Sequence, residues 1–234
     1  MKGFVFSLLV AAILCAVRAR ADVLFYGGDF IGSEWYANAL ANENDQSVHG
    51  NPYGAAVYQN FVVPPGQIWN VTGLFSNDLM TLAPPNGYWE IRSGLSEGNG
   101  GTLLASGTGA DSYHLKGQYG EYTNTVSGLN IVLGPGVYWF AVVPDAPEQQ
   151  GTSFNSNTFG TNSVGTQVSD QQYFNSPFYG YSFTNADNIS IFPRFSSGVL
   201  GTAVPEPSSL IILGSGLLAV TRAGRRRCPG TRSH

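Results

Sequence analysis

Short β-prone runs separated by Gly and Pro turns are the feature that most restricts how this chain can fold. Residues 137–143 (VYWFAVV) form the most apolar run of the interior and follow directly on the turn sequence GPG at 134–136. Residues 56–63 (AVYQNFVV) mix aromatic and β-branched side chains and end at PPG, residues 64–66. Strands favour such side chains, and turns favour Gly and Pro. No window of useful length shows helical periodicity with caps. We therefore expect an all-β fold, a single β-sandwich or jelly-roll-like domain, with residues 137–143 as its central strand.

The other expected strands are short and closely spaced along the chain. Residues 151–177 differ in composition, because they are rich in Asn, Ser, Thr, Gly and Gln but also carry aromatic residues. Disordered linkers have few aromatic residues, so we expect an ordered surface excursion pinned by its aromatic side chains. We expect a bulge or a close backbone approach at Gly73. The further strands are predicted at residues 68–75, 88–92, 102–105, 122–126, 129–133, 178–183 and 189–195.

The N-terminus has the layout of a signal peptide. Lys2 supplies a positive charge, residues 4–17 are apolar, and Ala19 and Ala21 are the small residues that a signal peptidase reads. We expect cleavage between Ala21 and Asp22, which removes a signal helix formed by residues 1–21.

The C-terminus combines three features in a fixed order. Val204-Pro205-Glu206-Pro207 comes first, and its prolines favour extended backbone. An uncharged apolar run follows within residues 208–223, the expected hydrophobic helix, which is shorter than the roughly 20 residues of a full membrane span. Basic residues that resist translocation come last; they are Arg225, Arg226 and Arg227.

This order resembles the PEP-CTERM sorting signal of exported proteins in bacteria of the Gram-negative type, which a membrane enzyme called exosortase processes. The resemblance implies export, transient anchoring in the inner membrane by the C-terminus, and final placement at the cell surface or outside the cell. It also divides the chain into segments. These are the signal peptide 1–21, the sandwich 22–196, a linker 197–203, the sorting signal 204–227 and a cytoplasmic tail 228–234.

The interior also resembles a recurring pattern of exported bacterial β-sandwich domains of unknown function. The matching stretches are YWEIRSG at 88–94, GTLLASG at 101–107, GL at 128–129 and LGPGVYW at 133–139. This resemblance implies a fold and no particular activity.

Charge excludes one class of partner. Residues 22–203 keep three basic residues, Arg92, Lys116 and Arg194, against 14 acidic ones, a net charge of about −11. Three scattered cations cannot neutralise a phosphate backbone, so we expect no nucleic-acid binding. The same residues contain no cysteine, because Cys15 and Cys228 lie in the targeting ends; no disulfide is therefore expected despite export.

Catalytic patterns are weak in this sequence. His49, His114 and His234 show no metal-binding spacing, and no nucleophile elbow or domain cysteine occurs. The carboxylates Glu90, Glu97, Glu121 and Asp111 could pair as acid and base of a glycan-active enzyme. In a domain with so many acidic residues some pair always looks suitable. We therefore predict that the protein is not an enzyme.

Calcium is the one ion that the composition favours. Glu43-Asn44-Asp45 and Asp187-Asn188 supply the oxygen ligands that Ca²⁺ prefers. Neither matches a known calcium-loop spacing, and turn-forming Asx residues are the alternative. We predict no cofactor and leave Ca²⁺ as the open alternative.

Sugar binding is the second function to consider. Trp35, Tyr36, Tyr53 and Trp89 could form a stacking platform, and Trp35 and Tyr36 are the aromatic residues least easily assigned to a core. We predict a structural or adhesive envelope or matrix protein, with an exopolysaccharide-binding module as the alternative. Its expected partners are signal peptidase, exosortase and the membrane.

Overall fold

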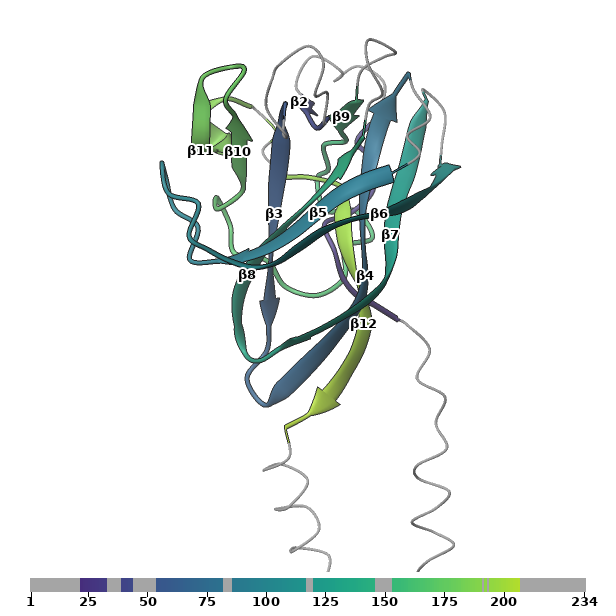
Figure 1. The fold of residues 1–234 in the computed structure, drawn as a ribbon, viewed down its shortest axis with the longest axis vertical. Coiled ribbons are helices and arrows are strands. Elements are labelled where there is room, and N and C mark those ends of the chain that lie inside the picture. The colour runs from purple at the N-terminus through teal and green to yellow at the C-terminus, as the bar shows by residue number, and fades with distance from the viewer. Residues whose placement is uncertain are drawn as a thin grey trace, which may run out of the picture.

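A computed structural model describes residues 22–32, 39–43, 54–81, 86–116, 120–145, 153–190, 192 and 194–206. The regular secondary structure of these residues is almost entirely strand, as the sequence predicts (Figure 1). Within the described part of the chain, no helix is long and apolar enough to cross a membrane. The elements are β1 (Asp22–Tyr26), β2 (Leu40–Ala41), β3 (Ala56–Val63), β4 (Gln67–Met80), β5 (Asn86–Ser93), β6 (Thr102–Leu115), β7 (Glu121–Leu133), β8 (Gly136–Pro144), β9 (Ser153–Asn155), β10 (Tyr173–Ser176), β11 (Tyr181–Asn185), the 3-10 turn η2 (Ala186–Asn188) and β12 (Ser197–Pro205).

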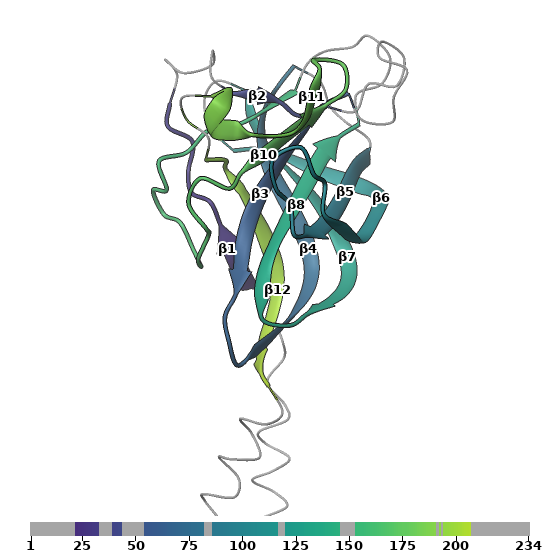
Figure 2. The same ribbon diagram turned by 90° about the vertical axis from the view of Figure 1, so that its left-hand side faces the viewer.

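The strands form two antiparallel layers, which confirms the predicted sandwich. One layer has the order β1-β12-β4-β7, and β9 adds to β4 and carries β2. The other has the order β5-β8-β3-β10-β11. Strand β6 belongs to both layers, because its residues 102–110 pair with β5 and its residues 111–115 pair with β7. In Figure 2 one layer lies behind the other, with β12 and β4 behind β3 and β8.

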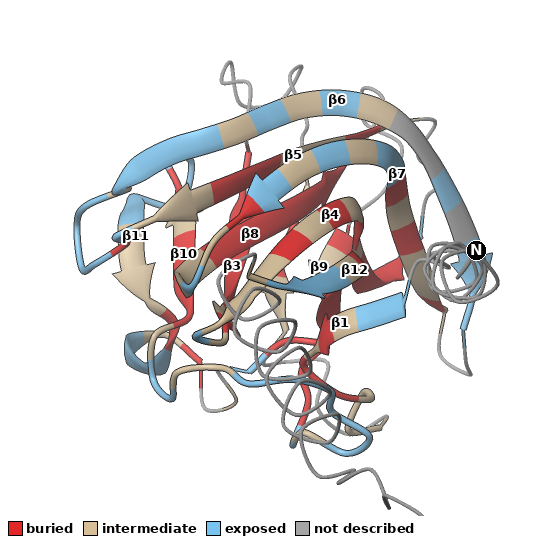
Figure 3. Ribbon diagram, turned by 90° about the horizontal axis from the view of Figure 1, so that it is seen from below, coloured by how far each residue is buried: buried red, intermediate tan, exposed pale blue. Residues whose placement is uncertain are grey.

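Aromatic and branched side chains fill the space between the layers. Phe25, Phe61 and Phe140 are almost fully buried and contact one another through tilted and edge-on rings. The ring of Trp69 stacks on Phe61 with centroids 5.7 Å apart. Seen from below, buried residues line the inner strands, and exposed residues lie along β6 (Figure 3). Each aromatic side chain buried here contributes to the hydrophobic stabilisation of the sandwich.

Several predicted strands are confirmed at their predicted positions. The prediction for 56–63 coincides with β3, and the prediction for 137–143 lies within β8. Strand β8 lies between β5 and β3, and its residues 139–144 are buried, as expected of a central strand. The register between β4 and β7 shifts next to Gly73, and an added Cβ there would lie 3.0 Å from the Val126 carbonyl oxygen, so the predicted bulge and close approach are both present.

The linker prediction for residues 197–203 is wrong. These residues form most of β12, which pairs with β4 along its whole length and with β1 at Gly198 to Gly201. Small residues make this position possible. A Cβ at Gly198 would lie 2.3 Å from the Phe75 ring. The folded domain therefore extends beyond residue 196 and into Pro205.

The C-terminal half also differs from the expected strand pattern. The predicted strand 178–183 overlaps only the start of β11, and its first residues form the turn after β10. The described part of 189–195 contains no named strand, and Phe195 forms a single bridge with Asn157.

The excursion from residue 153 onwards is ordered, as predicted. Hydrogen bonds from side-chain amides anchor it to the sheet as much as aromatic packing does. The Asn60 amide donates to the carbonyls of Val168 and Gln171, and the Asn60 side-chain oxygen accepts from the Val168 N–H. Gln59 donates to Gln167. Aromatic packing contributes through Tyr173 beside Trp139, among other contacts.

Candidate functional site

The sorting signal begins inside the folded sheet. Val204 and Pro205 are the last residues of β12 and lie opposite Ile68 and Gln67 of β4. The Glu206 N–H donates to the Gly66 carbonyl over 2.9 Å. Extended backbone, expected here from the prolines, is thus imposed by strand pairing as well. The remaining predicted signal residues, Pro207, Arg225, Arg226 and Arg227, lie outside the described residues.

The first strand of the domain lies next to β12, the strand that leads into the sorting signal. Asp22 is the first residue of β1 and pairs with Gly201 of β12. The predicted signal-peptidase residues Ala19 and Ala21 lie outside the described residues. Cleavage after Ala21 would therefore leave β1 intact from its first residue.

The predicted sugar contacts Trp35 and Tyr36 also lie outside the described residues, as does Tyr53. Trp89 is described and is half-buried, packed against the inter-layer core. An added Cβ at Gly107 would lie 3.1 Å from its ring, so the glycine makes room for the indole. Packing against the core therefore accounts for the presence of Trp89 at this position.

Glu90 is a buried carboxylate whose oxygens are both engaged. It accepts from the hydroxyl of Tyr58 at 2.5 Å and of Tyr88 at 2.9 Å. Arg92 donates through Nε at 2.6 Å and Nη2 at 3.1 Å, and its guanidinium lies 5.2 Å from the centroid of the Phe183 ring. Burial lowers the pKa of Arg92, but the hydrogen bonds and the charge of Glu90 outweigh it and raise that pKa. This is a structural ion pair: a carboxylate with four donors has little capacity left for a substrate.

A second buried carboxylate lies between the layers. Asp78 accepts from Asn42 and Asn124, each at 2.8 Å, and from the Ser76 hydroxyl. Burial raises the pKa of Asp78 to about 6, and the three donors limit the rise. Sequence reasoning missed this polar group. Asn and Ser are common in turns, and only their position within the long strands β4 and β7 could have indicated burial.

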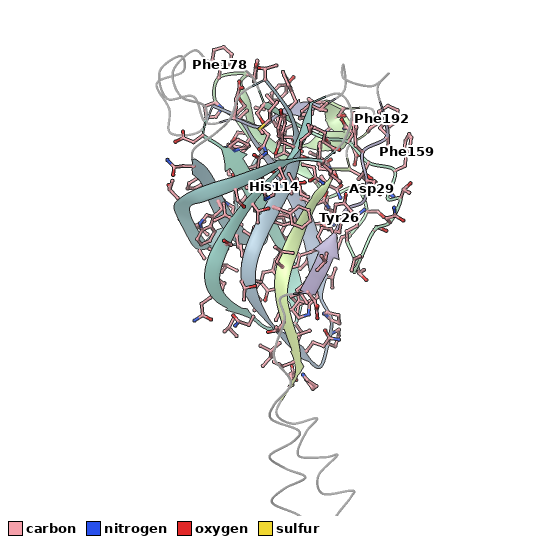
Figure 4. The ribbon with its side chains drawn as sticks, turned by 90° about the vertical axis from the view of Figure 1, so that its right-hand side faces the viewer. Tyr26, Asp29, His114, Phe159, Phe178 and Phe192 are labelled. Carbon is pink, nitrogen blue, oxygen red and sulfur yellow. The ribbon has the colours of Figure 1, made fainter. Side chains whose placement is uncertain are left out.

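Charged residues meet on the outer face of the first layer. The Tyr26 hydroxyl donates to Asp29 at 2.8 Å, and Lys116 contacts both, with its Nζ 3.4 Å from the Asp29 carboxylate. Figure 4 shows Tyr26 and Asp29 close together, with His114 on the same side of the molecule. Burial raises the pKa of Asp29, but hydrogen bonds from Asn162 and Tyr26 outweigh it and the pKa is lowered. Asp29 is thus an ionised partner of Lys116.

Glu121 lies near this group and is almost fully buried. Burial raises its pKa, and the Lys116 charge opposes the rise. Among the described residues, neither its Oε1 nor the buried hydroxyl of Ser156 has a hydrogen-bond partner, although Ser156 lies close enough to lower the Glu121 pKa. Of the other predicted acid–base residues, Glu97 accepts from the Asn185 N–H at 2.6 Å. The structure brings neither Glu90 nor Glu97 together with Glu121 as a pair.

Of the predicted calcium residues, Glu43, Asp187 and Asn188 are described. Glu43 accepts from the Ser153 N–H at 3.1 Å, whereas Asn44 and Asp45 lie outside the described residues. Asp187 and Asn188 form η2, where the Asn185 side chain accepts from the Asp187 N–H. This is the ordinary turn role of an Asx residue. Within the described residues, no three His, Cys, Asp or Glu side chains are grouped as metal ligands.

Comparison with known proteins identifies the C-terminal segment. A family described as the PEP-CTERM protein-sorting motif matches residues 203–227. No curated protein and no solved structure matches the chain. The match begins at Ala203, two residues before β12 ends, so the sorting motif and the sheet overlap. The motif is that of an exported protein that an exosortase processes and sorts to the cell surface.

Proposed function

We propose that this exosortase-sorted, exported protein is a non-enzymatic module of the cell envelope or extracellular matrix, with a structural or adhesive role. The observation that carries the proposal is the direct passage from β12 into the matched motif. The domain is joined to its sorting signal through a paired strand, without a spacer, so its attached end is fixed by the sheet. The opposite end points away from that attachment (Figure 1).

A non-enzymatic role accounts for the carboxylates. Glu90 and Asp78 are buried and hold donors from neighbouring side chains, which stabilise the sheet rather than a reacting group. In this proposal signal peptidase removes residues 1–21, and residues 208–223 hold the chain in the inner membrane until exosortase acts. The proposed role requires no cofactor. Binding of Ca²⁺ near Asp45 or Asp187 would be compatible with it.

Intact mass and fractionation of the native protein test the proposal. The expected mass begins at Asp22 and ends near Pro205-Glu206-Pro207, and the protein is expected outside the inner membrane. Recovery of the chain in the inner membrane with Arg225 to Arg227 intact would contradict it.

Exopolysaccharide binding is the second candidate, and aromatic exposure favours it. Phe159 is 61% exposed and Tyr179 51% exposed. Figure 4 shows Phe159, Phe178 and Phe192 toward the end remote from the exit of β12. Exposed aromatic rings can stack on sugars, and neutral sugars suit a domain with few cations. Saturable binding of the host's exopolysaccharide that is lost in Trp35→Ala or Tyr179→Ala would support this function, and absence of binding would remove it.

A further inference from the structure

Strand β6 has an open edge. Its residues 102–110 pair with β5 on one side, and β7 joins β6 only at residues 111–115. In the described part of the chain, no backbone hydrogen bond reaches the other side of residues 105–109. Figure 3 shows β6 as the outermost arch of the sandwich. Along an edge strand, N–H and C=O groups point outward with no strand to receive them.

The two outer edges of the strand order are covered, in contrast to β6. On β11, the Phe183 carbonyl accepts from the Gly98 N–H at 3.1 Å, and Glu97 accepts from the Asn185 N–H. On β1, Tyr26 exchanges two backbone hydrogen bonds with Val164, of 2.9 and 3.0 Å. Tyr26 on β1 and Phe183 and Asn185 on β11 are thus bonded on their outer side, whereas residues 105–109 of β6 have no such bond within the described residues.

The chemistry of the β6 edge suits strand pairing. Residues 105–109 (ASGTG) carry no charge and no proline, the residues by which edges are usually protected, and their side chains are small. A register shift opposite Leu103 and Ala105 places a bulge at Leu104 and ends the regular edge there. Leu103 and Leu104 are 46% and 44% exposed and form an apolar border beside it.

We propose that residues 105–109 of β6 pair antiparallel with the same residues of a second copy, and that this contact joins proteins on facing surfaces. The proposal rests on the proposed adhesive role and names its partner. An uncharged segment such as residues 105–109 can lie against its own copy without placing like charges opposite each other. Gly107 lies at the centre of the segment, where a two-fold axis would pass.

The orientation of the pair follows from its symmetry. Two identical antiparallel strands in one sheet are related by a two-fold axis normal to that sheet. Rotation about such an axis reverses every direction within that sheet and leaves the direction along the axis unchanged. The component of the β12 direction that lies within this sheet is therefore opposite in the two copies. A short ladder is weak alone, and many copies on two facing surfaces act together.

Cross-linking on cells tests the contact. The full chain, with Cys15→Ser and Cys228→Ser, is produced in its host with a single Thr108→Cys change, and a short bismaleimide is added. We expect a cross-linked dimer at least tenfold above that of the exposed control Ser163→Cys, because Thr108 lies next to the axis and Ser163 lies on a distant loop. Equal yields at the two positions would overturn the proposal.

A charge swap tests the same contact without cysteine. Cells carrying Thr108→Lys and cells carrying Thr108→Glu are each expected to lose clumping, and mixing the two is expected to restore it. Surface levels of both variants are measured so that misfolding is not mistaken for loss of contact. If a mixture with normal surface levels fails to clump, the β6 contact is refuted. If clumping needs the protein but ignores both substitutions, adhesion stands and the β6 pairing falls.

Discussion

Replacing Arg92 by Met should destabilise the domain strongly, because it leaves Glu90 buried without its cation. The Glu90 side chain is 3% exposed and that of Arg92 18%. The change removes hydrogen bonds of 2.6 and 3.1 Å to Glu90 and one of 2.9 Å to the Gly100 carbonyl. Only the hydroxyls of Tyr58 and Tyr88 then remain on the carboxylate. Removing one partner of a buried ion pair costs about 3–5 kcal/mol, a large part of the roughly 5–15 kcal/mol typical of a domain.

Urea unfolding followed by tryptophan fluorescence measures the effect. We expect the unfolding midpoint of Arg92→Met to fall while the slope with urea stays constant. The double variant Glu90→Gln with Arg92→Met removes the buried charge together with its partner, and we expect it to recover most of the loss. A loss of unfolding free energy below about 1 kcal/mol in Arg92→Met would refute the reasoning, because a buried carboxylate that loses its cation should destabilise the folded state by more than this. A double variant no more stable than Arg92→Met would show that shape, and not charge, sets the cost.

Three further predictions concern other parts of the domain. The pKa of Asp78 is raised to about 6 from 3.8, so the folded state binds this proton more tightly and the free energy of unfolding falls as pH rises between these values. Relative to Asp78→Asn, the wild type should lose about 2.4 kcal/mol between pH 4 and pH 7 in urea titrations, and a constant difference would contradict this. Gly198→Ala should destabilise the domain by about 2 kcal/mol or more in the same assay, because the new Cβ would lie 2.3 Å from the Phe75 ring and 2.7 Å from the Phe25 carbonyl oxygen; an unchanged midpoint would show that both the ring and the β1 backbone can move away. Inserting a short Gly-Ser spacer between Val204 and Pro205 should speed exosortase processing in a pulse-chase experiment, because the end of β12 must otherwise leave β4; an unchanged rate would mean that the paired end is already accessible.

Most of the sandwich could be predicted from local sequence, because its strands carry their own signal. Residues 56–63 and 137–143 combine aromatic and β-branched side chains between turns, and both form central strands. Residues 197–203 (SGVLGTA) contain two glycines and no aromatic residue, and the sequence predicts a linker there. They become β12 because β4 and β1, distant in sequence, approach so closely that only small residues fit. This cause depends on tertiary contacts, so the local sequence gives no indication of it.

The site divides in the same way. Pro205 and Glu206 belong to a linear motif, which sequence alone can reveal. The polar interior around Asp78 could not be predicted, because Asn42 and Asn124 look like turn residues until the fold buries them. Burying these two amides is tolerated because each donates to the Asp78 carboxylate.

The position of β12 has a mechanical consequence. Any traction on the domain from its C-terminal end enters along the axis of β12. The hydrogen bonds to β4 run across that axis through all nine residues of the strand, and β1 adds a second row. Such a load acts on the rows in shear, so many bonds must yield together, whereas a pull across the sheet would open them one at a time. The domain should therefore resist force applied along β12, the strand that leads into the sorting signal.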